Sequence, residues 1–181
     1  MAQRSYRLGH LDDGRWAPYR HADTFKLDGR LIAGVPGSDP GVFKAMLEIL
    51  RGPVRLLYVL HTPRGEAAPG RYESPDLSLD EATRFIERFA DFFASDGRFD
   101  LWAYSSTDRA TVVWDRHDQL FGYGPLDRFA SRLSEMGFKA GSVDVPVPHE
   151  HHYRKDMDDL AASVMHAFEW HYSPLRPEDE Q

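Results

Sequence analysis

Residues 99–124 read FDLWAYSSTDRATVVWDRHDQLFGYG, and this stretch decides the fold class. It contains short runs rich in β-branched and aromatic residues: Phe99–Ser105, Ala110–Trp114 and Gln119–Tyr123. Only the polar segments 106–109 and 115–118 separate these runs, and connections this short join strands that run antiparallel. The stretch therefore predicts a meander of three adjacent strands.

Two helix signals precede the meander. Asp39 followed by Pro40 is typical of the first turn of a helix, because the Asp side chain caps free backbone N–H groups and Pro has none to cap. Ser78 and Glu81 have the spacing of a capping box, and they open a helix that Gly97 is expected to end. The sequence thus predicts two helices upstream of the meander.

Two more helices are predicted downstream. One begins after Pro125 and ends at Gly137, and Phe138 is expected to fold back onto its last turn. The other covers roughly residues 156–170, where several Asp residues at the start complement the helix dipole. Both have apolar side chains at helical spacing, which predicts one buried face on each.

Further strands are predicted from apolar runs. Val54–Leu60 suits a buried strand, and we expect it to lie parallel to the first meander strand through a right-handed crossover. Residues 25–32 predict a hairpin, in which Asp28 and Gly29 suit a type I′ turn. Residues 142–147 contain a proline and therefore predict an edge strand.

Together these elements predict a single α+β domain over residues 1–181, with a mixed, mainly antiparallel sheet packed by about four helices. Residues 1–35 give no clear pattern beyond the hairpin. The Pro- and Gly-rich segment 62–77 predicts a long loop, which is either a lid or surface decoration. The tail 174–181 is predicted to be disordered.

The composition excludes several classes of site. The chain has no cysteine, which excludes disulfides, a thiol nucleophile and Cys-ligated metals. Its net charge of −7 argues against a nucleic-acid partner, which needs a clustered positive surface. No signal-peptide pattern and no apolar run of membrane-spanning length is visible. We therefore expect a cytoplasmic, soluble protein with no membrane partner.

The densest set of candidate metal ligands is a histidine cluster: His149, His151 and His152. Neutral imidazole binds zinc, nickel, copper or iron, and a His-x-His pair in an extended segment places both rings on one side. Glu150 is a candidate general base, and His166 or His171 is a candidate third ligand. The metalloprotease pattern His-Glu-x-x-His is not met. A hydrated loop without a metal is the alternative interpretation.

A second candidate site lies at the end of the strand 54–60. His61, with Arg64 and Glu66 in the following loop, is expected to form one wall of a pocket, because sheet ends commonly host sites. The alternative is a capped strand end with no function. His117 lies in the polar segment 115–118 and is interpreted as part of a hydrated hairpin tip.

Sequence motifs for nucleophilic catalysis and for phosphate binding are missing, and no organic cofactor is expected. The Gly122-Tyr123-Gly124 element is interpreted as a tight strand-to-helix turn. Two functions remain open. The first is a non-catalytic binding domain for a protein or small molecule, with immunity and antitoxin proteins as a class analogy only. The alternative is a small metal-assisted hydrolase that uses the histidine cluster at 149–152.

Overall fold

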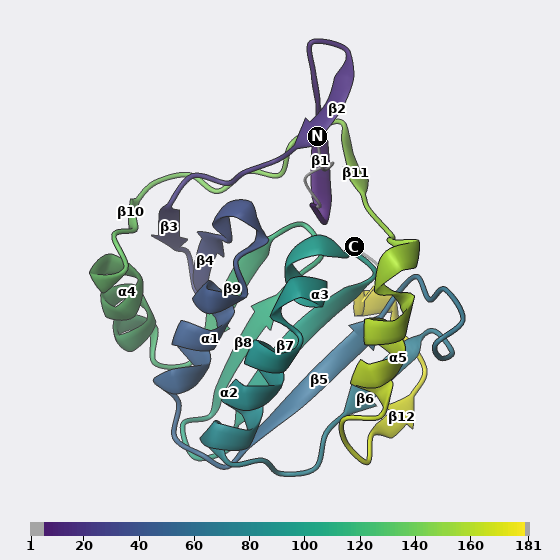
Figure 1. Ribbon diagram of the computed structural model, residues 1–181. Helices are drawn as coiled ribbons and strands as arrows, with labels where there is room; N and C mark the ends of the chain where they lie inside the picture. The colour runs from purple at the N-terminus through teal and green to yellow at the C-terminus, as the bar shows by residue number, and fades with distance from the viewer. Residues whose placement is uncertain (1–5, 180–181) are drawn as a thin grey trace.

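A nine-stranded sheet forms the centre of the computed structural model, which describes residues 6–179 (Figure 1). The strand order is β10-β3-β4-β9-β8-β7-β5-β6-β12. Neighbouring strands are antiparallel except β10 and β3, which are parallel. The strands are β3 (Thr24–Leu27), β4 (Leu31–Gly34), β5 (Val54–Leu60), β6 (Gly70–Glu73), β7 (Phe99–Ser105), β8 (Ala110–Trp114), β9 (Gln119–Tyr123), β10 (Lys139–Ala140) and β12 (His171–Ser173).

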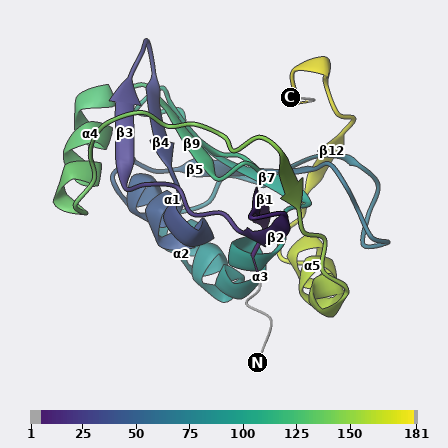
Figure 2. The ribbon, with the colours of Figure 1, turned by 90° about the horizontal axis from the view of Figure 1, so that it is seen from above.

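The helices cover one face of this sheet, and within residues 6–179 the opposite face carries no helix longer than a single short turn (Figure 2). The helices are α1 (Pro40–Glu48), α2 (Leu79–Arg88), α3 (Ala90–Ser95), α4 (Leu126–Glu135) and α5 (Asp158–Met165). Short 3-10 turns occur at Pro36–Ser38, Lys155–Met157 and Pro177–Asp179. The α+β class predicted from the sequence is confirmed. No helix in the described residues is long and apolar enough to cross a bilayer.

The core lies between the sheet and the helices. In β7, Phe99, Leu101 and Ala103 are fully buried, whereas Trp102 is only half-buried and Tyr104 is exposed. Successive strand residues point to opposite faces, so this alternation defines a helix-covered face and an open face. The open face carries the polar and aromatic side chains that form the cavity described below.

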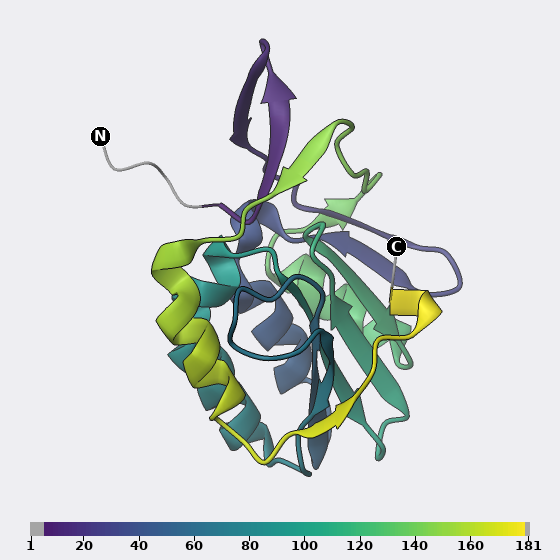
Figure 3. The same cartoon turned by 90° about the vertical axis from the view of Figure 1, so that its right-hand side faces the viewer.

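A separate three-stranded sheet stands at one end of the molecule (Figures 1 and 3). Its order is β11-β1-β2, with β1 (Leu8–Asp12) between β2 (Arg15–Pro18) and β11 (His149–His151). The β1–β2 hairpin turns at Asp13 and Gly14, which both have positive φ, as a type I′ turn requires.

Several local predictions are confirmed. The meander strands have the predicted bounds and run antiparallel. Asp39 caps α1 by accepting the N–H of Gly41, and Ser78 opens α2 in a reciprocal capping box with Glu81. The end of α4 has both Schellman bonds: the N–H of Phe138 donates to the carbonyl oxygen of Leu133, and the N–H of Gly137 donates to that of Ser134.

The predicted parallel pairing of β5 with β7 is wrong, because the two strands are antiparallel and pair Leu60 with Phe99. The reason lies in the intervening chain. After β5 the chain returns through β6 to the start of β5, where Leu77 bridges to Val54. The helices α2 and α3 then carry it back to the Leu60 end, so β7 begins where β5 finishes.

The segment 62–77 is not a continuous loop, because it contains β6. Residues 142–147 form no strand, and the chain pairs only later, in β11. β6 pairs with the nearby β5 and with β12 much later in the chain, and β11 pairs with β1 near the start of the chain. Pairing between such segments leaves little local signal.

Boundaries differ in three further places. The helix predicted to run to Gly97 is interrupted at Phe89, whose ψ of 17° is not helical, and α3 ends at Ser95. The last helix covers Asp158–Met165 instead of about 156–170. The hairpin at 25–32 is present as β3 and β4, but only Gly29 has positive φ there, so its turn is not type I′.

The tail is ordered from 174 to 179, contrary to the predicted disorder. It crosses the open face, and Asp179 is buried in an ion pair with Arg71 of β6. Residues 180–181 lie outside the described part of the chain. A buried charge pair of this kind fixes a segment that has little apolar surface of its own.

The turn from β9 to α4 requires glycine at position 124. Gly124 has φ of +118°, and a Cβ there would lie 2.9 Å from the Cβ of Ala110. We expect Gly124→Ala to lower the free energy of unfolding by about 1–3 kcal/mol. Gly29→Ala is the matched control, because its φ is also positive but its Cβ would meet no atom within 4 Å. Urea unfolding of both variants checks this, and equal losses would contradict the role of the close contact.

Candidate metal centre and adjoining cavity

Three histidines converge where the small sheet meets the nine-stranded sheet. His149 and His151 lie on β11, and His117 lies in the turn between β8 and β9. One ring nitrogen of each lies within 4.8 Å of one ring nitrogen of both others. The alternation of β11 places the two outer histidines on the same side of the strand, as the sequence predicted.

The spacing of the three rings suits a shared metal ion. Their centroids are 5.1 Å apart for His117 and His149, 5.0 Å for His117 and His151, and 5.3 Å for His149 and His151. Imidazole nitrogens about 2.0–2.1 Å from a zinc ion, at tetrahedral angles, place ring centres roughly 5 Å apart. The interplanar angles of 62–88° show that the rings meet edge-on and do not stack.

Two of the rings have their Nδ1 atoms engaged in hydrogen bonds. The Nδ1 of His117 lies 3.1 Å from a carboxylate oxygen of Asp115, and the Nδ1 of His149 lies 3.0 Å from the carbonyl oxygen of Pro146. Both acceptors require a proton on Nδ1, which leaves the Nε2 lone pair of each ring available. Carboxylates and carbonyls hold metal-binding histidines in this way.

The third ring, His151, is more deeply enclosed. Burial lowers the pKa of His151 to about 3, and the neighbouring His117 and Arg116 lower it further by charge repulsion. The ring is therefore neutral at physiological pH, which is the form that binds metals. Its Nδ1 is buried and has no hydrogen-bond partner in the described residues.

The structure separates His152 and Glu150 from the three histidines. They lie on the other side of β11, where His152 stacks on Tyr6 with ring centroids 3.9 Å apart. A carboxylate oxygen of Glu150 accepts hydrogen bonds from Tyr6 Oη and His152 Nε2, each 3.0 Å long. His166 follows α5 and His171 lies in β12. Both are exposed, and neither belongs to the converging group.

The ligand that sequence reasoning missed is His117. Its signal was the histidine flanked by Asp115 and Asp118 directly after a meander strand, a pattern that is equally typical of a hydrated turn. The sequence could not reveal that β11 pairs with β1, and that β1 brings this strand beside the turn. Long-range placement, and not residue type, decided which histidines meet.

Arg7 fixes the position of the small sheet. Its guanidinium is fully buried between the rings of Phe99 and Trp114, 4.8 and 4.5 Å from their centroids. It donates to the carbonyl oxygens of Phe99 and Asp115, and its Nε lies 3.3 Å from the carboxylate of Asp118. Since Asp115 and Asp118 bracket the β8–β9 turn, Arg7 joins the segment leading into β1 to the turn that carries the histidine at 117.

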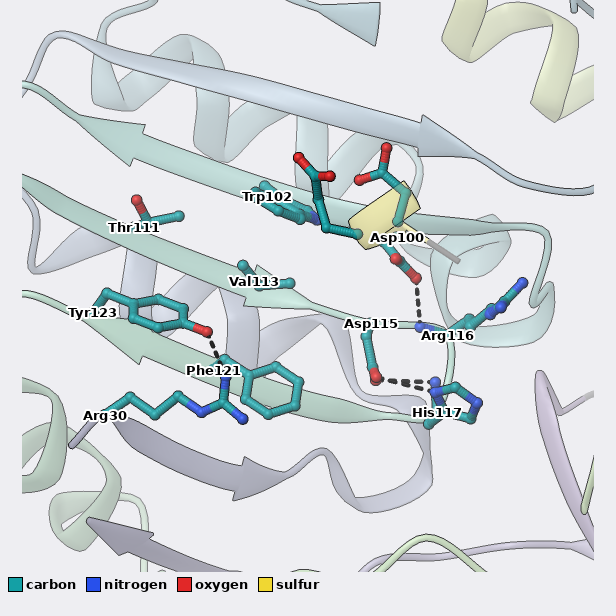
Figure 4. Close-up of a pocket in the computed structure, with 12 residues that line it drawn as sticks. Arg30, Asp100, Trp102, Thr111, Val113, Asp115, Arg116, His117, Phe121 and Tyr123 are labelled. Atoms are coloured by element: carbon teal, nitrogen blue, oxygen red, sulfur yellow. Dashed lines mark hydrogen bonds and ion pairs between the residues drawn. The ribbon is translucent and has the colours of Figure 1, made fainter. Parts of the chain in front are cut away.

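A cavity of about 380 Å³ lies on the open face of the sheet, and His117 is the one of the three histidines that lines it (Figure 4). Its size is within the usual range of small-molecule sites. One end holds Arg30 and Tyr123, and the other holds Asp115 and His117. The remaining lining residues come from β7, β8, β9 and the C-terminal segment: Asp100, Trp102, Thr111, Val113, Arg116, Phe121, Glu178 and Asp179.

His61 contacts Asp100, one of the residues that line this cavity. Its Nε2 lies 2.8 Å from one carboxylate oxygen of Asp100, and the other oxygen accepts the backbone N–H of Arg116 at 2.7 Å. Asp100 is therefore held beside the residue that precedes His117. The His61 side chain itself is only 5% exposed.

The structure places Arg64 and Glu66 in an ion-pair network instead of the cavity wall. Glu66 pairs with the fully buried Arg98 at 3.0 Å, and Arg64 pairs with Asp158 at 2.9 Å. Arg98 also contacts Asp158 and both carboxylate oxygens of Asp96. These bonds tie the 62–69 segment to the start of α5.

Comparison of the chain with family models, with curated proteins and with solved structures finds no match in any of the three. The geometry of the site is therefore the basis for the functional argument.

Replacing Arg7 tests its anchoring role. Arg7→Met keeps much of the side-chain volume but leaves Asp118 buried without its cation, and burial already raises the pKa of Asp118. We expect the free energy of unfolding in urea to fall by about 3–5 kcal/mol. Arg15→Met, on the exposed strand β2, serves as the control and should change it by less than about 0.5 kcal/mol. Equal stability of the two variants would show that Arg7 is not the anchor.

Proposed function

We propose that this chain is a metal-dependent hydrolase that binds a divalent transition metal, zinc in the first instance, through His117, His149 and His151. The observation that carries the proposal is the convergence of three imidazoles, two of which have their Nδ1–H groups engaged by Asp115 and by a backbone carbonyl. Neutral nitrogen ligands suit zinc, copper, nickel and iron. The spacing of the three rings is compatible with the tetrahedral coordination of zinc.

The number of ligands favours a catalytic over a closed site. Catalytic zinc sites have three protein ligands and keep the fourth position for water or substrate, whereas structural sites have four protein ligands. No fourth His or carboxylate joins the group in residues 6–179. Bound zinc supplies a Lewis acid and a water whose pKa falls to about 7.

Asp100 is the side chain to which we assign acceptance of the proton from the attacking water. It lines the same cavity as His117 and is held next to the β8–β9 turn through the N–H of Arg116. The Nε2–H of His61 donates to its other oxygen, which makes His61 a positioning residue that fixes the orientation of the carboxylate. This role replaces the one assigned to Glu150, which lies on the other side of β11 from the three histidines and does not line the cavity.

A non-catalytic binding domain is the second proposal, and one observation favours it. In the described residues β2 pairs only with β1, so its other edge is open, and the opposed side chains of Leu11 and Trp16 are each 46% exposed. An open edge with an apolar pair is a common place for a partner strand to add. In that case a metal would have a structural role and would hold β11 against the β8–β9 turn of the larger sheet.

Metal-binding measurements distinguish the ligand set His117, His149 and His151 from the set His149, His151 and His152, which is adjacent in sequence. Untagged protein, stripped with chelator and titrated with Zn²⁺ against a chromophoric competitor, should bind one equivalent. Asp115→Asn, which changes the hydrogen-bond partner of a ligand, should weaken zinc affinity by roughly 10–100-fold. His117→Ala, which removes a ligand, should weaken zinc affinity at least as strongly. His152→Ala is the matched control and should bind as the wild type does. Loss of binding in His152→Ala, with His117→Ala unaffected, would refute the proposed ligand set.

The open coordination position is tested with Co²⁺ in place of Zn²⁺. An exchangeable fourth position predicts that azide changes the visible spectrum of the cobalt protein. A spectrum that azide leaves unchanged would indicate a closed, structural site and would overturn the hydrolase proposal.

A further inference from the structure

The cavity beside the three histidines has a fixed cation at its far end. The guanidinium of Arg30 lies 4.7 Å from the centroid of the Phe121 ring and 5.8 Å from that of Tyr123, and its Nη1 donates to the Tyr123 hydroxyl at 2.7 Å (Figure 4). Stacking and the hydrogen bond hold the planar group in place. No carboxylate of the described residues forms an ion pair with Arg30, unlike Arg71 and Arg98 nearby in the fold.

The middle of the cavity is apolar and flat. Phe121, Val113 and Trp102 lie on neighbouring strands β9, β8 and β7 and face the same side of the sheet. The indole Nε1 of Trp102 is buried and has no hydrogen-bond partner in the described part of the chain. Unpaired buried donors are uncommon in folded proteins, so this one needs a partner such as a water or a ligand atom. A ring-bearing ligand with a polar atom suits this wall.

The opposite end holds the carboxylates of Asp100 and Asp115 together with Arg116, beside His117. The acidic residues Glu178 and Asp179 line the same cavity from the C-terminal segment. Asp179 is paired with Arg71, and Glu178 lies 3.9 Å from Arg176, so these two carboxylates add little net charge. The guanidinium of Arg30 therefore favours an anionic group of the ligand at its own end of the cavity. A planar carboxylate matches the fork of a guanidinium.

The length of the cavity limits the size of the ligand. Phe121, under the Arg30 guanidinium, and His117 are four residues apart in the chain. A strand rises about 3.3 Å per residue, so four residues span at most about 13 Å, and the turn before β9 shortens this to a distance on the order of 10 Å. A single aromatic ring with a substituent at each end has this length.

We propose that the cavity binds a small aromatic monocarboxylate, with the carboxylate at Arg30, the ring against Phe121 and Trp102, and an ester or amide bond directed toward the three histidines. The hydrolytic part of this inference rests on the proposed metal function, whereas recognition of the carboxylate does not. Hydrolysis of such an ester adds the oxygen of water to the carbonyl carbon and breaks its C–O bond to the ring oxygen. The electron pair stays on the ring oxygen, which takes one proton of the water, and the second proton leaves with the acid product.

Binding is measured first, with 4-hydroxybenzoate as the probe and calorimetry on both metal-free and zinc-loaded protein. Loss of a charge-assisted contact costs about 10–100-fold in affinity, so Arg30→Gln should weaken binding by this factor and Arg30→Lys by less. Arg15→Gln, an exposed arginine on β2, is the matched control and should bind normally. Phenol, which has no carboxylate, should bind the wild type as weakly as 4-hydroxybenzoate binds Arg30→Gln.

Turnover is measured next, with 4-acetoxybenzoate and its uncharged counterpart phenyl acetate. Zinc-loaded wild type should prefer the charged ester by about 10-fold or more in kcat/KM, and Arg30→Gln should abolish that preference. His117→Ala should abolish hydrolysis while still binding 4-hydroxybenzoate, which separates failure of the metal function from failure of recognition. Equal binding of 4-hydroxybenzoate by wild type and a folded Arg30→Gln variant, equal binding of phenol, or tighter binding of phenyl phosphate would overturn the inference.

Discussion

The buried guanidinium of Arg7 is the interaction on which the candidate site depends. It lies between the rings of Phe99 and Trp114, and it donates to the carbonyl oxygens of Phe99, at the start of β7, and Asp115, just after β8. The backbone of the same residue accepts the N–H of His152 at 3.0 Å, so one residue holds the small sheet and contacts the β8–β9 turn. A charge in the core is tolerated only when it is paired and hydrogen-bonded, and Asp118 completes that requirement.

A second buried arginine has the same role at the neighbouring corner. Arg98 is bonded to Asp96, Glu66 and Asp158, which belong to three separate segments of the chain. It also donates to the carbonyl oxygen of Arg154, just after β11. The charged residues of the 62–69 segment are thus explained by fixation of the fold. The two arginines together leave β11 little freedom relative to the larger sheet.

The local elements were predictable from the sequence, and their long-range partners were not. The Asp39 cap, the Ser78 capping box and the meander strands depend on neighbours within a few residues, and local physical rules describe them well. The orientation of β5 against β7 depends on where α2 and α3 return the chain. Long-range placement also limited the prediction of the site. His149 and His151 could be expected to lie on one side of a strand. Their proximity to His117 depends on the pairing of β11 with β1, which lies in residues 1–35, where the sequence has no clear pattern.

The shared position of β1 has a consequence for how the two ends of the molecule communicate. One edge of β1 pairs with β2 of the protruding hairpin, and the other pairs with β11, where Leu8 lies opposite His151. A partner that bound the hairpin and shifted β1 would act on β11 through this pairing. If the imidazoles hold the proposed metal, thermodynamic reciprocity then requires the metal to change the affinity of the hairpin for that partner by the same factor. In this arrangement Arg7 is the fixed contact between the segment that carries the hairpin and the larger sheet.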